Sequence, residues 1–404
     1  LRRRRRAFRN ALSLVLLSVR LPQRRSASER QEAQDPVKEV ALMGQFLNSL
    51  TRLTSPLVLE VAVHGTGDEI HFYIAAPRDA VPFVTRSIQG IWSEAEVLEA
   101  PEYSVFNPQG AAEGVYLRQK RSPLLPIKTF RELGVDTFAP LLNTFSKLHT
   151  TEEGMAIQVI LQAAHPSQAK RVSDALSALR GGKSLKEALG EGAGFFASLF
   201  GSGKEKEKSG DAPAPIVVDE RAVKALEQKI SQPLFLANVR LIVSARDSRR
   251  TEELLHPLMH SFAGFSGELR NEFSFVRMSP AQRFFSFIFR QLEFGQRAVL
   301  SSDEIASFFH FPVAGSAAPN VRWLSFKEVA PPTNLPSSGA YLGESAFRGD
   351  RRPVYLSEDD RRRHLYIVGQ TGTGKSNLLN LMIQDDIRSG KGVALIDPHG
   401  DLVE

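Results

Sequence analysis

In the first third of the chain, apolar positions at helical spacing are followed by two apolar runs around a glycine-containing loop. This pattern predicts a helix and then a β-hairpin. A second helix-spaced segment and a short apolar run extend it to β-β-α-β, which indicates a small α+β module. The predicted elements are a helix over Val37–Leu53, strands over Leu57–Val63 and Glu69–Ala76, a helix over Arg78–Trp92 and a strand over Ala95–Ala100.

A related pattern returns later in the chain, interrupted by a long insertion. No residue-level repeat connects the two regions, so a duplicated ferredoxin-like unit is a hypothesis. The predicted elements are strands over Gly154–Ala164, Leu234–Arg246 and Leu269–Met278, and helices over Ser167–Leu179 and Ser248–Phe262.

Changes in composition divide the chain into parts. Glycine, alternating charge and low hydrophobicity cannot offset the entropy of ordering, so we expect a flexible insertion at 181–215. Proline, alanine and serine mark a linker. The predicted parts are a basic tail and linker at 1–36, a first α+β module at 37–150, a second at 151–311, an interdomain linker at 312–342 and a further domain at 343–404, where the sequence changes character.

Charge is concentrated at the N-terminus. The net charge is +6, yet residues 1–25 contain nine arginines and no acid, which leaves −3 for the rest. Two interpretations stay open: a solvated or nucleic-acid-contacting tail, or a cytoplasmic segment beside transmembrane helices further upstream, as the positive-inside bias predicts. The apolar run 11–19 is too short to cross a bilayer.

Other chemistry is limited by composition. The chain has no cysteine, which excludes disulfides and thiolate metal sites, and its nine histidines are scattered. Residues 279–299 interleave phenylalanine with arginine. Such a segment can stack on single-stranded nucleic acid, but we favour packing of these rings into a core.

A phosphate-binding loop is the strongest motif. Residues 369–376 fit G-x-x-x-x-G-K-S between a predicted strand, His364–Val368, and a predicted helix, Asn377–Arg388. Glycines allow the tight turn and leave room for phosphates at a helix N-terminus. Lys375 is expected to reach the β- and γ-phosphates of ATP, and Ser376 to bind Mg²⁺. The predicted nucleotide-binding residues are Gly369, Gln370, Thr371, Gly372, Thr373, Gly374, Lys375, Ser376 and Asn377.

A second buried-type strand is predicted over Val393–Ile396, closing a β-α-β crossover with the first. It ends at Asp397, which has two interpretations: a Mg²⁺ partner of Walker B type, or a strand-end acid that shapes the site. Pro398 stands where a hydrolytic acid commonly follows, and this favours the second interpretation.

Residues 364–379 (His-Leu-Tyr-Ile-Val-Gly-Gln-Thr-Gly-Thr-Gly-Lys-Ser-Asn-Leu-Leu) and 394–402 (Ala-Leu-Ile-Asp-Pro-His-Gly-Asp-Leu) carry a family resemblance. They resemble the FtsK–HerA superfamily of DNA-pumping ATPases, most closely the type IV secretion and conjugative coupling ATPases. The strand at 351–356 fits as well. The resemblance implies that the Walker B acid lies on a later strand, so Asp397 is not that residue.

The resemblance implies an ATP- and Mg²⁺-dependent DNA translocase that works as a homo-hexamer with a type IV secretion-like membrane complex, at the cytoplasmic face of the bacterial inner membrane. Two alternatives stay open: a soluble HerA-like helicase–translocase, and a nucleotide-gated adaptor without productive hydrolysis. Because position 1 is Leu and the last residues follow a strand-like run, we expect a fragment of a longer protein, in which 343–404 is the incomplete N-terminal part of a RecA-like P-loop ATPase domain. With no assignable base and an incomplete sheet, this fragment is expected to have negligible ATPase turnover of its own.

Overall fold

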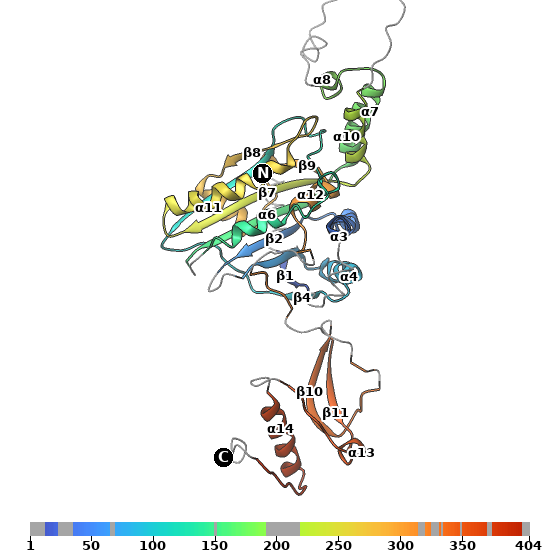
Figure 1. The fold of residues 1–404 in the computed structure, drawn as a ribbon, viewed down its shortest axis with the longest axis vertical. Coiled ribbons are helices and arrows are strands. Elements are labelled where there is room, and N and C mark those ends of the chain that lie inside the picture. The colour runs from blue at the N-terminus through green and yellow to red at the C-terminus, as the bar shows by residue number, and fades with distance from the viewer. Residues whose placement is uncertain are drawn as a thin grey trace, which may run out of the picture. The chain divides into compact units, whose positions relative to one another are not determined.

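The computed structural model describes residues 13–22, 35–64, 69–148, 152–190, 219–313, 320–324, 331–332, 334–347, 350–369 and 374–397. The chain separates into two compact units, Leu1–Ser325 and Phe326–Glu404, and each is described by itself (Figure 1).

The first unit is built on one sheet, in which the described residues contribute nine strands in the order β4-β1-β3-β2-β6-β7-β5-β8, with β9 paired to β7. Its first half follows the chain as β-α-β-β-α-β. Every pairing within this half is antiparallel, and the order β4-β1-β3-β2 is that of a split β-α-β arrangement. The elements are β1 (Leu14–Arg20), α3 (Pro36–Ser49) with η1 (Leu50–Arg52), β2 (Leu57–Val63), β3 (His71–Pro77), α4 (Val81–Ile91) and β4 (Glu96–Glu99).

The second half repeats this topology. Its strand order from the outer edge inward is β8-β5-β7-β6, which matches β4-β1-β3-β2 strand for strand, and its pairings are also antiparallel. The elements are β5 (Ala111–Gln119), α5 (Phe130–Leu133), α6 (Ala139–Phe145), β6 (Gly154–Ala163), β7 (Leu234–Ala245), α11 (Ser248–His260), η2 (Ala263–Phe265) and β8 (Phe273–Arg277).

The two halves meet where β2 pairs with β6 in antiparallel register from Leu57↔Leu161 to Val63↔Met155. The predicted modules, 37–150 and 151–311, are therefore joined in one continuous sheet. The predicted strands and helices of both regions are found within a few residues of their expected bounds.

The strand β1 differs from the expectation of a basic tail over 1–36. Leu14–Arg20 pairs with both β3 and β4, and Leu16 and Leu17 are buried. An internal strand is covered on both faces, so its sequence is continuously apolar instead of alternating. The arginines on both sides of this short apolar run led to the prediction of a basic tail.

One face of the sheet carries the main hydrophobic core. Alternate residues of each strand, such as Leu59 of β2 and Ile157 of β6, pack against α3, α4, α6 and α11, with α12 (Ser302–Phe308) beside them. Figure 1 shows these helices along the sheet.

The opposite face carries a row of polar side chains across five adjacent strands. Tyr73 pairs with Glu60, Glu60 with Gln158, Gln158 with Arg240, and Arg240 with Tyr116. Segments 100–110 and 278–297 cover this row. The second segment contains a π-helix, η3 (Gln282–Ser286), and a 3-10 turn, η4 (Phe294–Gln296), before β9 (Ala298–Ser301).

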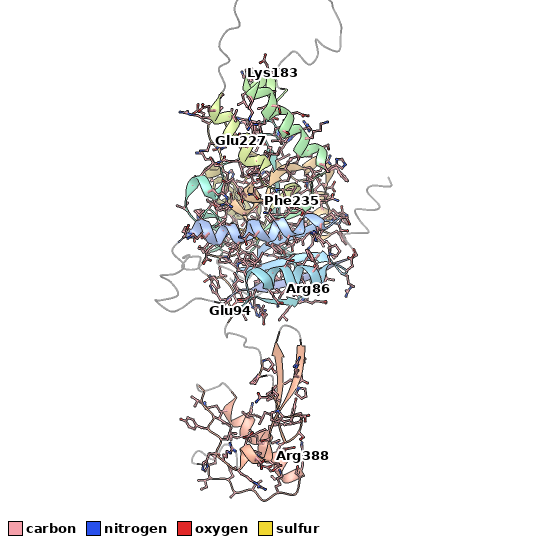
Figure 2. All side chains as sticks on the ribbon, turned by 90° about the vertical axis from the view of Figure 1, so that its right-hand side faces the viewer. Arg86, Glu94, Lys183, Glu227, Phe235 and Arg388 are labelled. Carbon is pink, nitrogen blue, oxygen red and sulfur yellow. The ribbon has the colours of Figure 1, made fainter. Side chains whose placement is uncertain are left out.

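A helical pair is inserted between β6 and β7, where the first half has a short hairpin. The pair is α7 (Pro166–Arg180) and α10 (Glu220–Ile230), the short α8 (Leu185–Ala188) contacts α7, and the insertion has a small core of its own. In Figure 2 this pair stands away from the sheet, with Lys183 at its far end and Phe235 within the sheet. Most of the insertion predicted at 181–215 lies outside the described residues.

Residues 320–324 end the first unit, bound to two strand termini. Ile70 donates its N–H to Asn320 O (2.7 Å) and accepts from Arg322 N (3.0 Å), while Leu324 donates to Leu21 O (2.9 Å). This part of the predicted linker at 312–342 is thereby hydrogen-bonded to the ends of β1 and β3.

The second unit contains an antiparallel hairpin of β10 (Ala340–Phe347) and β11 (Asp350–Leu356), followed by α13 (Glu358–Arg361) and α14 (Lys375–Arg388). The strands predicted over His364–Val368 and Val393–Ile396 are not found, because neither segment is paired in a ladder. Tyr366 is 89% exposed and Ile396 93%. A strand is stabilised by hydrogen bonding along its edges, and neither segment is assigned to a strand among the described residues of this unit.

Candidate nucleotide-binding site

The helix α14 begins at a glycine in the left-handed region. Gly374 has φ 90°, and no side chain caps the N–H groups of the first turn. A Cβ at Gly374 would have no atom within 4 Å, so this glycine is required by its backbone conformation and not by crowding. The result is a helix N-terminus without a side-chain cap and with a positive dipole end, which is a site that favours an anion.

Lys375 is the first residue of α14. Its Nζ donates a hydrogen bond to the carbonyl oxygen of Gly369 at 2.8 Å, which brings both ends of the glycine loop together. The lysine is half-buried, whereas Ser376 and Asn377 are exposed on the first turn. The ammonium group and the hydroxyl therefore lie at the same end of α14.

The remaining loop residues of the predicted site, Gln370, Thr371, Gly372 and Thr373, lie outside the described residues. Asp397 is half-buried. No group of three metal-binding side chains occurs in the part of the chain that is described. The assignment of Asp397 to Mg²⁺ stays a prediction.

The opposite end of α14 is fixed by ion pairs. Arg361 holds Asp386 with both guanidinium nitrogens, and Lys391 contacts Glu358. An open hollow lies at this end, and three acids, Glu358, Asp359 and Asp385, line it together with Lys391. A triphosphate would be repelled there. These contacts thus position the helix, and the anion site is at its N-terminus.

The observed residues fit ATP with Mg²⁺. The uncapped first turn supplies N–H donors, the Lys375 ammonium supplies charge, and the Ser376 hydroxyl is the oxygen ligand that Mg²⁺ accepts beside phosphates. The motif predicted Lys375 and Ser376 beside a helix N-terminus, where they lie. It carries no signal for the contact between Lys375 and the Gly369 carbonyl.

Two family models match the chain. The model described as "Helicase HerA, central domain" matches residues 340–404, and the model described as "Domain of unknown function (DUF8128)" matches residues 55–324. The second match covers more than half of the sequence. The chain belongs to the DUF8128 family. A comparison with curated proteins gave no match.

The limits of the two matches agree with the division into units at residue 325. The HerA match supports a P-loop ATPase of the HerA–FtsK superfamily for the second unit. The DUF8128 match begins at residue 55, yet β1 and α3 lie before it and belong to the same sheet and core.

Proposed function

We propose that this DUF8128 protein is an ATP-binding DNA translocase of the type IV secretion or conjugative coupling type. The observation that carries the proposal is the uncapped N-terminus of α14, opened by Gly374 and followed by Lys375 and Ser376, within a segment that matches a HerA central domain. The fold supports nucleotide binding at this point because backbone donors and a cation converge on one small volume.

Each residue has a role in this proposal. The Lys375 ammonium exchanges the Gly369 carbonyl for phosphate oxygens, and Ser376 holds Mg²⁺. ATP, when bound, supplies the free energy of phosphoryl transfer. The helix α14 connects the phosphate-binding end of the site to the Arg361–Asp386 ion pair. A change at the phosphates can therefore be transmitted along this helix.

DNA is the proposed substrate, and a homo-hexamer at the cytoplasmic face of the bacterial inner membrane, with a type IV secretion-like complex as partner, is the proposed assembly. The superfamily match supports the ATPase and translocase part of this description. Within the described residues, no helix combines the length and apolar character needed to cross a bilayer.

Equilibrium binding of a fluorescent ATP analogue to the 404-residue chain, with and without Mg²⁺, tests the proposal. Lys375→Ala should weaken binding by about tenfold or more, because a charge-assisted contact to phosphate is lost. Lys391→Ala is the matched control, since that lysine contacts Glu358 at the other end of α14. Equal affinities of both variants and the unaltered protein would contradict the assignment.

DNA dependence tests the second part. Nucleotide affinity should change when single- or double-stranded DNA is added, and by linkage DNA affinity should change when the nucleotide is added. If ATP binds but DNA neither binds nor alters nucleotide affinity, a nucleotide-gated adaptor is the better description.

A further inference from the structure

Residues 320–324 are bound to the sheet beside two ionisable side chains. Ile70 makes two of the backbone hydrogen bonds that hold this segment, and its chain neighbours are Glu69 and His71. Ile70 itself is buried, so the polar side chains at the attachment are those on either side of it. A change of charge at either neighbour would act directly on the attachment.

The Glu69 carboxylate faces two bases through one oxygen atom. Its Oε2 lies 3.5 Å from Nη1 of Arg322 and 3.9 Å from Nε2 of His71. The guanidinium is the stronger partner while the imidazole is neutral. Once protonated, the imidazole becomes a second cation beside the same oxygen, where it competes for the carboxylate and repels the guanidinium.

The ring of His71 is held by an aromatic cluster. It is stacked on Tyr73, with 5.8 Å between ring centroids and 5° between ring planes, and its centroid lies 4.9 Å from that of His64. His64 is stacked on Tyr103 at 4.6 Å, and its Nε2 lies 2.8 Å from the Tyr73 hydroxyl oxygen. These contacts fix the place at which a proton on His71 puts its charge.

The groups around this cluster disfavour charge on His71. Burial lowers its pKa to about 4, and His64, Arg322 and Arg20 add repulsion. By linkage, a proton on His71 must weaken the binding of Arg322 as much as bound Arg322 opposes the proton. Burial and then Arg322 also lower the pKa of His64, while burial raises the pKa values of Tyr73 and Tyr103. Nearby acids are Glu69, Glu60, which is bound to Arg290, and Glu96, which is paired with Arg20.

Few contacts hold the segment. Three backbone hydrogen bonds join its described residues to Ile70 and Leu21. Val321 packs at the margin of the main core, and the Arg322 side chain is 41% exposed in its ion pair with Glu69. A segment with so few buried contacts can open while the sheet stays folded.

We propose that protonation of His71 releases residues 320–324 from the sheet and so controls where the chain that leads to the second unit is held. The imidazolium draws the Glu69 carboxylate from Arg322 and repels the guanidinium. The backbone of Ile70 lies between Glu69 and His71, so its two hydrogen bonds to the segment are the first to feel this change.

Release changes the point at which the first unit holds the chain. The second unit begins at Phe326, shortly after Leu324. Among the described residues, the nearest buried one before the segment is Val313, which belongs to the main core. Release therefore moves the attachment back from Leu324 to Val313. This device needs neither ATP nor DNA, so Lys375→Ala should respond to pH as the unaltered chain does.

Hydrogen exchange of the 404-residue chain at about pH 7.5 and about pH 5.5 tests the inference. The reporters are the N–H groups of Ile70, Arg322 and Leu324, each of which donates one hydrogen bond of the attachment. Their protection factors should fall by about five- to tenfold at the lower pH, because one histidine whose pKa rises from about 4 to 6.5 on release supplies at most about tenfold. The N–H of Ala164, which donates to Leu234 O in the sheet, should keep its protection.

His71→Gln should keep residues 320–324 attached at both pH values, because glutamine gains no charge. His256→Gln is the matched control, since His256 is exposed on α11. Trp323 gives a second readout, because it is half-buried within the segment. In a Trp92→Phe background, its quenching by acrylamide should rise in acid when His71 is present and stay constant in His71→Gln.

Three outcomes would overturn the inference. The first is unchanged protection of all three reporter amides at the lower pH. The second is an equal fall in His71→Gln, which would assign the proton to another group such as Glu69. The third is an equal fall at Ala164, which would show that acid weakens the whole sheet and not the attachment. The first and third need no variant, so they decide the question even where His71→Gln folds poorly.

Discussion

Arg290 and Glu60 form a buried ion pair between residues 230 positions apart in the chain, with 3.0 Å between Nε and Oε1. The arginine has φ 48°, in the left-handed region, and is 8% exposed. Glu60 also accepts from Tyr103 and from Gln158. The carboxylate therefore holds two covering segments on the centre of the sheet.

Replacement of Arg290 should be strongly destabilising. Arg290→Ala leaves a buried carboxylate without its cation, and we expect a loss of about 3–5 kcal/mol in the free energy of unfolding. Urea denaturation measures this loss. Arg297→Ala, on the exposed end of the same segment, should change stability by no more than about 0.5 kcal/mol. Equal midpoints for the two variants would contradict this role of Arg290.

A second buried pair fixes the helical insertion to the core. Lys229 of α10 and Glu304 of α12 are both inaccessible, with 2.9 Å between Nζ and Oε2, and burial lowers the pKa of Lys229 while Glu304 opposes the shift. Lys229→Met should cost about 3–5 kcal/mol, and Lys229→Met/Glu304→Gln should recover part of that loss. Lys224→Met, exposed on the same helix, is the control. A double variant less stable than Lys229→Met would argue against the pair.

Acid should weaken the first unit through His71. Burial lowers the pKa of His71 to about 4, and His64, Arg322 and Arg20 add repulsion. Because the folded-state pKa lies below the unfolded value of 6.5, the unfolded chain binds more protons between these two values. Above the unfolded-state pKa of 6.5, this contribution to the free energy of unfolding is fully present. It is lost as the pH falls through the folded-state pKa of about 4.

The size of the His71 effect follows from partial exposure. Solvent screening reduces it to about 1–2 kcal/mol. Unfolding midpoints of His71→Gln should therefore fall less between about pH 7.5 and pH 4 than those of the unaltered chain. His256→Gln, on the exposed face of α11, should behave as the unaltered chain does. Parallel pH profiles for all three proteins would exclude this contribution.

The first turn of α14 should respond to two small changes in different ways. Ser376→Ala should reduce the Mg²⁺-dependent part of ATP affinity and leave Mg²⁺-free binding nearly unchanged. Gly374→Ala should weaken both, because an alanine at φ 90° is strained by about 1–2 kcal/mol and the helix start would rotate away from it. Isothermal titration with and without Mg²⁺ separates the two effects. A Mg²⁺-independent loss in Ser376→Ala would contradict the metal role.

Local pattern predicted many elements of the first unit, but the strands β1 and β5 were not among them. Leu57–Val63 is a strand at its predicted bounds because all seven of its residues are buried and its ends are marked by polar loop residues. The pairing of β2 with β6 was beyond prediction, because a register such as Glu60↔Gln158 joins distant parts of the chain and depends on three-dimensional packing. An isolated charge in an apolar strand, as at Glu60 and Arg240, was the available signal for the polar row.

In the candidate site, the motif identified the residues but not their surroundings. Lys375 and Ser376 lie at a helix N-terminus as predicted. The phenylalanines of 279–299, which we expected to pack in a core, show the opposite case. Phe287 is buried whereas Phe285 is 61% exposed, and residue type alone does not distinguish them. The sequence pattern indicates which secondary structure is favoured, whereas the burial of a side chain depends on what packs against it in the folded protein.

The attachment of residues 320–324 determines how the first unit would respond to mechanical load. Tension applied beyond Leu324 reaches the Leu21 carbonyl first and the backbone of Ile70 next. These hydrogen bonds would break one after another, so residues 320–324 should detach at low force while the sheet stays intact. Released, residues 320–324 would add their length to the chain that follows the sheet.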